Sequence, residues 1–357
     1  MDTVTMADER VETFDERVRR LLRWHFDPET GSTFWLQQRA KLDFDPLTDV
    51  NDAAGLLRFP DLTDELRHVP VDELIPRGLR GTGFQVYESG GTSGAPKRIV
   101  DREYRRRLLS WAMGRLRAHH IPEPANWLHL GPTGPHVFAY DCSRYAALGK
   151  GMFHTVDFDP RWVKKLVASG DVDIVKRYVR HLLDQAAEVL RSQPIKVLST
   201  TPPLIEAICA DAELHALVER NVETIIWAGT SFSSESLRQV EELFFPEKTI
   251  VGIYGNTLMG VAPQRPRRHD DTHLCVFEPY AESVRIDVVD DDGAVVEYGQ
   301  RGRVRLSLVS EEMFLPNVIE RDTAVRVEPA DHGAVDGLAE VGTVAAVGDV
   351  RVIEGVY

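Results

Sequence analysis

One glycine-rich stretch constrains this sequence more than any other. Residues 87–97 read Tyr-Glu-Ser-Gly-Gly-Thr-Ser-Gly-Ala-Pro-Lys. Because glycine has no side chain, its backbone N–H groups can approach an anion closely, and the hydroxyls of serine and threonine add further donors. Lys97 places a positive charge at the end of the run, where it can meet a phosphate. The stretch predicts a phosphate-binding loop. The alternative is a surface turn, since glycine and serine are common in turns.

Two widespread phosphate motifs do not match this stretch. A Walker loop has Gly-Lys-Ser/Thr at the start of a helix, whereas Ala95 and Pro96 separate Gly94 from Lys97. The dinucleotide motif Gly-x-Gly-x-x-Gly is absent from the run. The stretch instead resembles the phosphate loop of the adenylate-forming superfamily (acyl-CoA synthetases and peptide-synthetase adenylation domains), usually written Tyr-x-Ser-Gly-x-Thr-Gly-x-Pro-Lys. This resemblance assigns the phosphates of ATP to Ser89, Gly90, Gly91, Thr92, Ser93, Gly94 and Lys97.

The totals argue against several classes of function. A formal net charge of −14 disfavours a generic surface for nucleic acid or anionic membrane. No apolar run reaches membrane-spanning length, and the first 20 residues lack the apolar core of a signal peptide. Cys142, Cys209 and Cys275 are widely spaced, which is typical of a reducing compartment. We therefore expect a cytoplasmic protein that binds neither nucleic acid nor membrane.

The order of apolar segments predicts an α/β fold. Strand-like runs at 127–130, 195–199, 222–228 and 247–254 alternate with helix-like segments at 102–120, 161–191 and 204–220, which indicates a mainly parallel sheet. Ligands bind at the carboxyl ends of such strands, where we expect the glycine-rich stretch, Gly229 and Gly255. After residue 260, runs at 278–290 and 301–308 predict antiparallel strands, with a turn at 291–293.

Four regions are expected along the chain. Residues 1–80 form an N-terminal helical segment, and residues 81–262 form the α/β region that binds nucleotide and acid. Residues 263–347 form a smaller β-rich subdomain. Residues 348–355 resemble the superfamily's hinge, Asp-x-aliphatic-Lys-aliphatic-x-Gly, so that 348–357 are expected as a hinge remnant and the small C-terminal domain that normally follows is expected to be absent.

A second motif lies at residues 253–257, Ile-Tyr-Gly-Asn-Thr. It resembles the superfamily's Tyr-Gly-x-Thr-Glu segment, in which the tyrosine stacks on adenine, the threonine approaches the α-phosphate and the glutamate helps to hold Mg²⁺. The resemblance implies that Tyr254 contacts the base and Thr257 the α-phosphate, with Gly255 and Asn256 beside the nucleotide.

The same motif departs from the superfamily at its metal ligand. Leu258 stands where the glutamate is expected. Mg²⁺ binds carboxylate, phosphate and water oxygens, none of which a leucine supplies. Either phosphates and waters suffice, or Glu88 or another acid substitutes, or the chemistry is weakened. The metal ligands therefore stay open.

The acid that binds ribose is expected further along the chain. Residues 302–306 resemble the strand that precedes a Thr-Gly-Asp triplet in the superfamily, whose aspartate binds ribose. Here the triplet is Glu320-Arg321-Asp322. The resemblance assigns to Asp322 the two ribose hydroxyls, which a carboxylate can accept together. The alternative is an exposed acid in a hairpin turn.

An aromatic segment follows the first expected buried strand. His136, Phe138 and Tyr140 lie in residues 134–140, expected as a loop, and this segment resembles the one that lines the carboxylate pocket of the superfamily. Its rings could stack against an aromatic acid, and His136 could orient the carboxylate. The alternatives are ordinary aromatic core and a packed histidine. The expected substrate pocket comprises His136, Phe138, Tyr140, Trp227 and Leu258.

Other clusters carry less information. The arginines of residues 102–120 could form an electropositive wall near a triphosphate, although such charge runs usually face water. His269, His273 and Cys275 are zinc-ligand types, but their spacing is typical of an exposed turn. No Gly-x-Ser-x-Gly elbow occurs, which disfavours a serine hydrolase.

The phosphate loop, adenine segment, ribose acid and hinge occur in the superfamily's order. The N-terminal segment and short length are similar to the phenylacetate–CoA ligase branch and to shortened adenylating proteins of phenazine antibiotic biosynthesis. The resemblance implies an ATP- and Mg²⁺-dependent ligase that activates an aryl, or a fatty, carboxylic acid as its acyl-adenylate, with Lys97, Thr257 and His136 as catalytic residues.

Two other functions stay open. One is a module that holds AMP or an acyl group without turnover. The other is an acyl-protein synthetase that passes the acyl group to a carrier protein or to a cysteine such as Cys142. The sequence does not decide which acid is used, whether CoA, a carrier protein or an amine accepts the acyl group, or whether the chain forms a homodimer.

Overall fold

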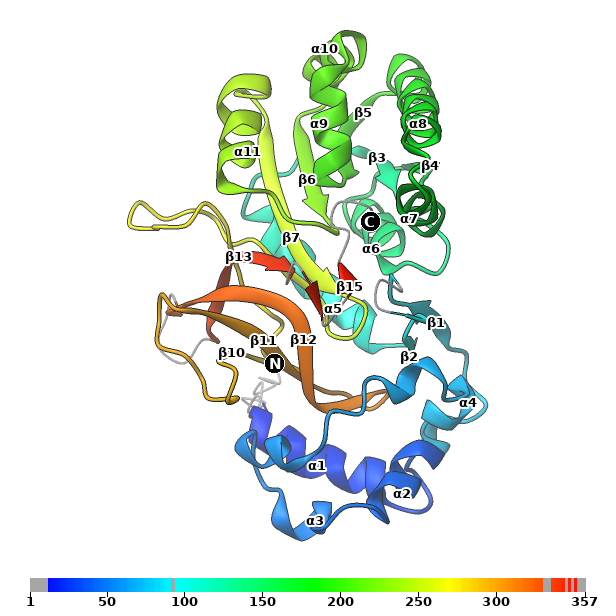
Figure 1. The fold of residues 1–357 in the computed structure, drawn as a ribbon, viewed down its shortest axis with the longest axis vertical. Coiled ribbons are helices and arrows are strands. Elements are labelled where there is room, and N and C mark those ends of the chain that lie inside the picture. The colour runs from blue at the N-terminus through cyan, green and yellow to red at the C-terminus, as the bar shows by residue number, and fades with distance from the viewer. Residues whose placement is uncertain (1–11, 91–93, 330–334, 344–345, 348–349, 352–357) are drawn as a thin grey trace, which may run out of the picture.

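The structure is a computed structural model that describes residues 12–90, 94–329, 335–343, 346–347 and 350–351 (Figure 1). Its N-terminal part is helical. A capping box starts the first helix, because Thr13 accepts from the backbone of Glu16 and the Glu16 carboxylate accepts in return. The elements of this part are α1 (Phe14–Phe26), α2 (Thr33–Arg39), α3 (Pro46–Asp49), η1 (Ala54–Arg58), η2 (Glu65–Arg67), α4 (Val71–Leu74) and η3 (Arg77–Leu79).

An aromatic cluster attaches these N-terminal helices to the β-rich part of the chain. The rings of Phe26, Trp35 and Phe59 surround Phe314, with centroids 5.1 to 5.9 Å from it. The indole N–H of Trp35 also donates to the backbone carbonyl of Phe314 at 3.0 Å. Aromatic pairs at these separations add to the stability gained from burial alone. Residues 12–80 are thereby fixed against one end of the strand that carries Phe314.

A six-stranded sheet forms the centre of the molecule (Figure 1). Five neighbouring strands are parallel, and the sixth is antiparallel to the fifth. The strands are nearly continuous apolar runs because both faces of a parallel sheet are covered. In sheet order they are β4 (Phe153–Asp157), β3 (Asn126–Gly131), β5 (Ile195–Thr200), β6 (Thr224–Ala228), β7 (Thr249–Asn256) and β8 (Gly260–Pro263).

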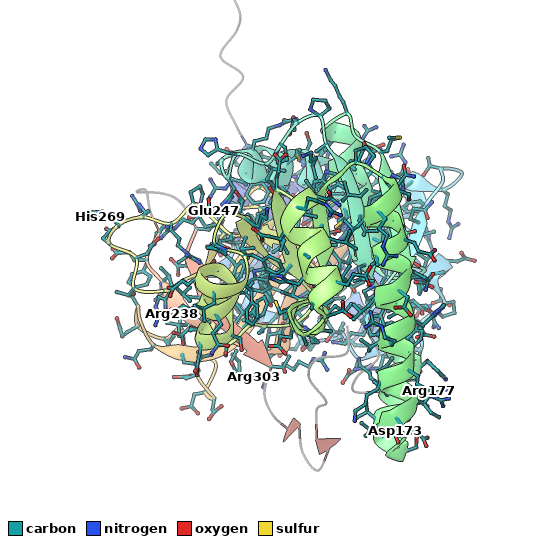
Figure 2. The ribbon with its side chains drawn as sticks, turned by 90° about the horizontal axis from the view of Figure 1, so that it is seen from above. Asp173, Arg177, Arg238, Glu247, His269 and Arg303 are labelled. Atoms are coloured by element: carbon teal, nitrogen blue, oxygen red, sulfur yellow. The ribbon has the colours of Figure 1, made fainter. Side chains whose placement is uncertain are left out.

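Helices alternate with these strands along the chain, as the sequence predicts, but several bounds differ. They are α5 (Tyr104–Arg117), α6 (Val137–Leu148), α7 (Pro160–Ser169), α8 (Val172–Ser192), α9 (Pro202–Ala210), α10 (Ala212–Asn221), α11 (Ser234–Gln239) and the π-helical turn η4 (Val240–Phe244). In Figure 2, Asp173 and Arg177 project outward from the free end of α8. No helix in the described ranges is both long enough and apolar enough to cross a bilayer.

Three sequence predictions about this region are wrong. The single helix expected at 161–191 is two helices, because Gly170 adopts a left-handed conformation (φ = 81°) that ends α7. The helix expected at 204–220 breaks at Asp211, whose carboxylate accepts from Leu214 N and so caps α10. The segment expected as a loop up to Tyr140 enters α6 at Val137.

The β-rich part is a five-stranded antiparallel sheet. Its strands, in sheet order, are β10 (Val284–Val289), β11 (Arg301–Val309), β12 (Phe314–Val327), β13 (Gly337–Thr343) and β9 (Val276–Phe277). The predicted turn after β10 is confirmed, because Gly293 has φ = 81° and donates to the carbonyl of Asp290. Asp322 lies within the long strand β12, opposite Thr343 of β13, and not in a hairpin turn.

The glycine-rich stretch lies outside the central sheet, contrary to the expectation that it follows a parallel strand. It connects β1 (Gln85–Glu88) to β2 (Arg98–Asp101), which pair only with each other and are antiparallel. Near the other end of the chain, β14 (Ala346–Val347) pairs with β15 (Val350–Arg351). The remaining residues of the expected hinge, 348–349 and 352–357, lie outside the described part of the chain.

Candidate functional site

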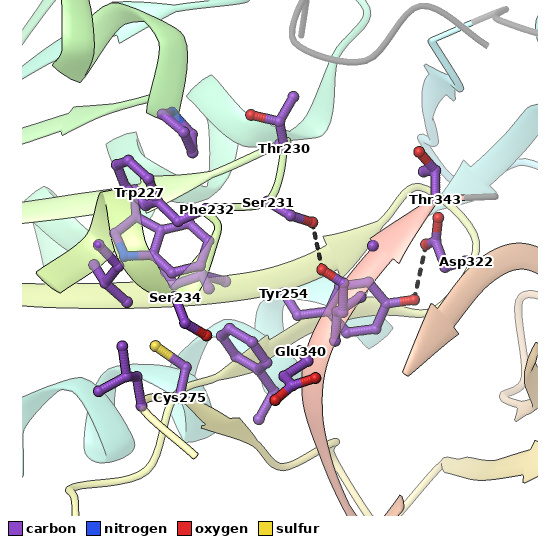
Figure 3. Close-up of a pocket in the computed structure, with 18 of the residues that line it drawn as sticks. Trp227, Thr230, Ser231, Phe232, Ser234, Tyr254, Cys275, Asp322, Glu340 and Thr343 are labelled. Atoms are coloured by element: carbon purple, nitrogen blue, oxygen red, sulfur yellow. Dashed lines mark hydrogen bonds between the residues drawn. The ribbon is translucent and has the colours of Figure 1, made fainter. Parts of the chain in front are cut away.

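Two adjoining cavities lie where the two large sheets face each other. The larger, of about 1060 Å³, is bordered by the glycine-rich stretch, the N-terminal segment and the carboxyl ends of β6 and β7. The smaller, of about 270 Å³, lies beside β6 and β13 (Figure 3). Because they share part of their lining, an extended ligand can occupy both. The shared residues are Gly229, Ile253, Gly255, Arg321, Asp322 and Thr343.

The two ends of the glycine-rich stretch are fixed to each other. The backbone N–H of Ser89 donates to the carbonyl of Lys97 at 2.9 Å, and the N–H of Lys97 donates to the Ser89 hydroxyl at 2.9 Å. Gly94 has φ = 133°, a conformation that favours glycine. Ser89, Gly90 and Lys97 line the large cavity, whereas the expected phosphate ligands Gly91, Thr92 and Ser93 lie outside the described residues.

Glu88, one candidate to replace the missing metal ligand, is already bound by protein cations. Its two carboxylate oxygens accept from Arg98 at 2.9 Å and from Arg161 at 2.8 Å. Burial raises the pKa of Glu88, but the hydrogen bonds from Arg161 and Arg98 outweigh it and bring the pKa below its ordinary value. Arg161 also donates to the carbonyl of Ser89 at 3.3 Å. Glu88 therefore positions the glycine-rich stretch and has no carboxylate oxygen left without a donor.

The expected adenine and ribose residues contact each other. The Tyr254 hydroxyl donates to Asp322 Oδ2 at 3.0 Å, as the dashed line in Figure 3 shows. Tyr254 is buried and lines the small cavity, and Asp322 lines both cavities. Burial, the charge of Asp322 and the hydrogen bond all raise the pKa of Tyr254, so that the hydroxyl stays protonated and can donate. The structure thus brings these two predicted residues together at the junction.

The turn after β7 carries the rest of the second motif. Asn256 Oδ1 accepts from the backbone N–H groups of Leu258 at 2.9 Å and Met259 at 2.8 Å, which closes the turn. Thr257 lines the large cavity, and its hydroxyl lies 3.5 Å from the carbonyl of Glu88. Leu258 is buried and contributes an apolar surface to the same cavity. Thr257 and the glycine-rich stretch therefore border one space.

The expected acid-binding residues separate into three locations. His136 and Phe138, which flank the start of α6, line the large cavity. Burial lowers the pKa of His136, and the charge of Arg161 lowers it further, which favours a neutral imidazole. Tyr140 packs on Tyr87 with ring centroids 5.7 Å apart and is not among the residues that line either cavity.

Trp227, the remaining aromatic of the expected acid pocket, lines the small cavity instead. Its ring lies 5.2 Å from that of Phe232, edge to face (Figure 3). It also lies 6.0 Å from the ring of Phe277, again edge to face. It shares this cavity with Gly229, which has φ = 86°, and with Tyr254. Trp227 is thus on the side of the expected base and not on that of the acid.

Sequence reasoning missed the contribution of the N-terminal segment. Asp61, Asp64 and Arg67 line the large cavity although they lie 20 to 26 residues before the glycine-rich stretch. Arg67 donates to Asp64 at 3.0 Å and also to the carbonyl of Ala95 in the glycine-rich stretch. No motif marks these residues, because isolated charges in a polar segment are common at any surface.

Glu320, the first residue of the triplet that ends in Asp322, also lines the large cavity. Its Oε1 atom is buried, and no group in the described part of the chain donates to it. Burial, together with the charge of Asp322, raises the pKa of Glu320 to about 7, although Lys97 and Arg321 act in the opposite direction. Two carboxylates therefore face the cavity from one strand.

The basic helix α5 does not form an electropositive wall at the cavities. Arg105 is buried and forms a bidentate ion pair with Asp141, with distances of 2.6 and 2.7 Å. Burial lowers the pKa of Arg105, but the charge and hydrogen bonds of Asp141 raise it more, so that the guanidinium stays charged. Asp141 itself borders the large cavity. None of the arginines of α5 is among the described residues that line a cavity.

The weaker candidates for metal and nucleophile are not assembled into sites. Figure 2 shows His269 at the tip of a projecting loop, where its side chain is 98% exposed. The described residues contain no group of three or more histidine, cysteine or acidic side chains that could hold a metal ion. Cys142 is fully buried, and burial raises the pKa of its thiol, which disfavours the thiolate needed for acyl transfer.

Comparison with solved structures finds this fold in acyl-CoA ligases. An open conformation of 2-hydroxyisobutyryl-CoA ligase, in complex with 2-HIB-AMP and CoA, has a TM-score of 0.69 at 11% identity; the match covers 92% of this chain and 69% of the ligase. The same ligase in its thioesterification state has a TM-score of 0.67 at 13% identity, covering 95% and 69%. ATP-bound MatB from Rhodopseudomonas palustris has a TM-score of 0.50 at 13% identity, covering 72% and 47%.

These likenesses confirm the predicted fold class, an α/β large part with a parallel-rich sheet and a separate antiparallel β-rich subdomain, as in adenylate-forming enzymes. No family model matches the sequence, and no curated protein matches it.

Proposed function

We propose that this protein activates a carboxylic acid with ATP, forming an acyl-adenylate and releasing pyrophosphate. The observation that carries the proposal is the position of Asp322. It lies where the two cavities meet, bound to Tyr254, while Lys97 and Thr257 line the large cavity with it. A nucleotide whose ribose contacts Asp322 can direct its base into the small cavity and its phosphates toward Lys97.

The residues of the chain act mainly by positioning and by stabilising charge. A carboxylate oxygen of the acid attacks the α-phosphorus, and the bond from the α-phosphorus to the bridging oxygen breaks, so that pyrophosphate leaves with the electron pair. Lys97 and the N–H groups of the glycine-rich stretch stabilise the negative charge on the leaving phosphates. Thr257 donates to the α-phosphate, and Asp322 accepts from the ribose hydroxyls. Holding the reactants in line in this way accounts for much of the expected acceleration.

The acid occupies the part of the large cavity next to α6. Val137, Phe138 and Leu258 supply apolar surface there, and neutral His136 can donate a hydrogen bond to the carboxylate. A mainly apolar surface with a few polar groups is typical of sites for apolar ligands, and an aryl acid is such a ligand. CoA, a carrier protein and an amine stay open as the acceptor of the acyl group.

Mg²⁺ would neutralise charge on the triphosphate and on the departing pyrophosphate. The chain lacks the metal ligand expected at position 258 but has other carboxylates that could bind the ion. Leu258 cannot bind it, and Glu88 is occupied by Arg98 and Arg161. Carboxylates that face the large cavity are nevertheless present on β12, at Glu320 and Asp322.

Isotope exchange between pyrophosphate and ATP tests this function. We expect exchange that depends on an added acid, with aryl acids ahead of fatty acids in a panel of both. Asp322→Ala should weaken the binding of AMP and ATP alike, whereas Lys97→Ala should slow exchange more than it weakens AMP binding. Asp173→Asn serves as the control, because this carboxylate is 96% exposed at the start of α8 and lines neither cavity.

The outcomes separate the three functions considered. Nucleotide binding without exchange for any acid would contradict the proposal and favour a passive binding module. Acyl label that remains on the protein, and is lost in Cys142→Ser, would favour an acyl-protein synthetase. Unchanged AMP affinity in Asp322→Ala would remove Asp322 from the ribose site.

A further inference from the structure

The acids around the large cavity differ in what they already bind. Six carboxylates line it: Asp61, Asp64, Glu65, Asp141, Glu320 and Asp322. Five of them accept hydrogen bonds from protein groups. Asp61 accepts from Thr63 and from Ile319 N, Asp64 from Arg67, Glu65 from Gln38, Asp141 from Arg105, and Asp322 from Tyr254. The Oε1 atom of Glu320 is buried and accepts no hydrogen bond in the described part of the chain. A buried polar atom without a partner is unusual in a folded protein, and a bound water or ion is one explanation for it.

Glu320 lies between the expected ribose acid and the expected phosphate lysine in its electrostatic contacts, since the charges of both Asp322 and Lys97 act on it. Glu320 and Asp322 belong to a part of β12 where the pairing with β11 is irregular, and both side chains line the large cavity. Both line the large cavity together with Lys97, whose charge acts on Glu320. A nucleotide that runs from Asp322 toward Lys97 therefore occupies the cavity into which Glu320 faces.

Charge makes the immediate surroundings of Glu320 unfavourable for a bare phosphate. A triphosphate carries several negative charges, and Glu320 and Asp322 add two more on one strand when ionised, although Arg67, Lys97, Arg303 and Arg321 also line the cavity. Like charges in a partly desolvated cavity repel strongly, since screening by water is reduced there. A divalent cation between Glu320 and the phosphates reverses the sign of the interaction. Mg²⁺ in nucleotide sites is commonly held by one or two carboxylates together with phosphate oxygens and waters.

We propose that Glu320 is the protein ligand of the Mg²⁺ ion that accompanies ATP in the large cavity, in place of the acid that Leu258 cannot supply. This inference rests on the proposed function, because it requires a nucleotide in that cavity. It assigns different roles to the two acids of β12. Glu320 binds the metal, and Asp322 binds the sugar.

The test measures metal and nucleotide binding directly, with Mn²⁺ as the probe and α,β-methylene-ATP as a nucleotide that cannot react. Electron paramagnetic resonance gives the Mn²⁺ affinity of the protein–nucleotide complex. We expect Glu320→Gln to weaken it roughly tenfold or more, because a carboxylate ligand is replaced by a neutral amide. Asp173→Asn, an acid that is 96% exposed at the start of α8 and lines neither cavity, is the control and should leave the Mn²⁺ affinity unchanged.

A second measurement separates metal binding from a structural role. In EDTA, without any divalent ion, Glu320→Gln should bind the analogue more tightly than the native protein, because a repelling charge is removed. With Mg²⁺ present, Glu320→Gln should bind the analogue less tightly than the native protein does. A variant that is merely misfolded would bind less tightly in both conditions. Glu320→Asp, which keeps a carboxylate on a shorter side chain, should retain part of the Mn²⁺ affinity.

The results also distinguish this inference from the proposed function. Native protein that binds no nucleotide at all would overturn both. Native protein that binds nucleotide and catalyses exchange, while Glu320→Gln keeps full Mn²⁺ affinity, would overturn the metal assignment alone.

Discussion

The two cavities that meet at Asp322 are built by different kinds of interaction. The small cavity is formed largely by packing, with Trp227, Phe232 and Phe277 edge to face around it. The large cavity is bordered by charged groups from segments far apart in the chain, including Arg67 from the N-terminal segment and Asp141 from α6. Shape should therefore govern the small cavity, and the pairing of charges should govern the large one.

The largest expected effect comes from breaking a charge pair at the large cavity. Arg105→Ala leaves the Asp141 carboxylate buried without its guanidinium partner. Removal of one member of a buried ion pair typically destabilises a protein by about 3–5 kcal/mol. We expect a loss of this order in the free energy of unfolding, measured by urea denaturation.

The double variant Arg105→Met, Asp141→Leu is the matched control for this prediction. It removes both charges, so that no unpaired ion is left, and apolar pairs of similar volume often replace buried ion pairs without loss of stability. The double variant should be more stable than Arg105→Ala. If both proteins lose the same stability, packing rather than charge governs this side of the large cavity, and the contrast between the cavities fails.

The sequence predicted the parts of the site whose chemistry is local. The glycine-rich stretch, the turn after β7 and Asp322 each carry a short pattern, and of these Lys97, Thr257 and Asp322 line one cavity. The parallel sheet was predictable for the same reason, since its apolar strands and intervening helices repeat along the chain.

The parts that the sequence missed depend on contacts between distant segments. Arg105 looked like one more charge on a solvated helix, and only the fold shows that it turns inward to Asp141, 36 residues away. Trp227 was expected beside the acid, but it lines the small cavity, where its ring packs against the backbone of Gly252, which has no side chain to displace it. The bounds of α7 and α9 were missed because a single residue, Gly170 or Asp211, ends each helix without interrupting the apolar pattern.

The second prediction concerns pH and a histidine beneath the large cavity. His129 is fully buried, its ring lies 4.8 Å from Phe138, and its Nδ1 is 3.0 Å from the Ser199 hydroxyl. Burial lowers its pKa to about 4, although a hydrogen bond with the Pro132 carbonyl opposes this. In the unfolded chain the ordinary pKa of histidine is about 6.5, so the unfolded state takes up the proton first. Stability should therefore be fully present above about pH 6.5 and fall as the pH drops toward 4.

The size of this loss is on the order of 3 kcal/mol at most, from a pKa difference of about two and a half units. Urea denaturation at pH 7, 5.5 and 4.5 measures it. His129→Gln removes this titrating group, so the free energy of unfolding should depend less on pH. Part of the dependence should remain, because burial also lowers the pKa of His25 on α1 to about 4. If the free energy of unfolding falls with pH as steeply in His129→Gln as in the native protein, the His129 imidazole does not stay neutral in the folded state.

The third prediction tests whether shape governs the small cavity. A Cβ atom at Gly252 would lie 2.6 Å from Trp227 Cζ2 and 3.1 Å from Phe277 Cε1, closer than such atoms pack. Gly252→Ala should therefore displace the indole into the cavity and destabilise the protein by about 1–3 kcal/mol, the usual range for overpacking. Thermal unfolding measures the loss, and a shift in tryptophan fluorescence reports the displaced ring.

Gly114→Ala is the control for Gly252→Ala because it makes the same chemical change without a collision. Gly114 is an exposed residue of α5, and a Cβ atom there would meet nothing within 4 Å. Alanine is the better helix former, so this variant should gain roughly 0.5–1 kcal/mol. A loss of stability in Gly252→Ala together with a gain in Gly114→Ala would show that steric packing governs the small cavity. If Gly252→Ala is neutral and leaves nucleotide affinity unchanged, the Trp227 ring can move freely, and a base bound beside it would have to be positioned by Tyr254 alone.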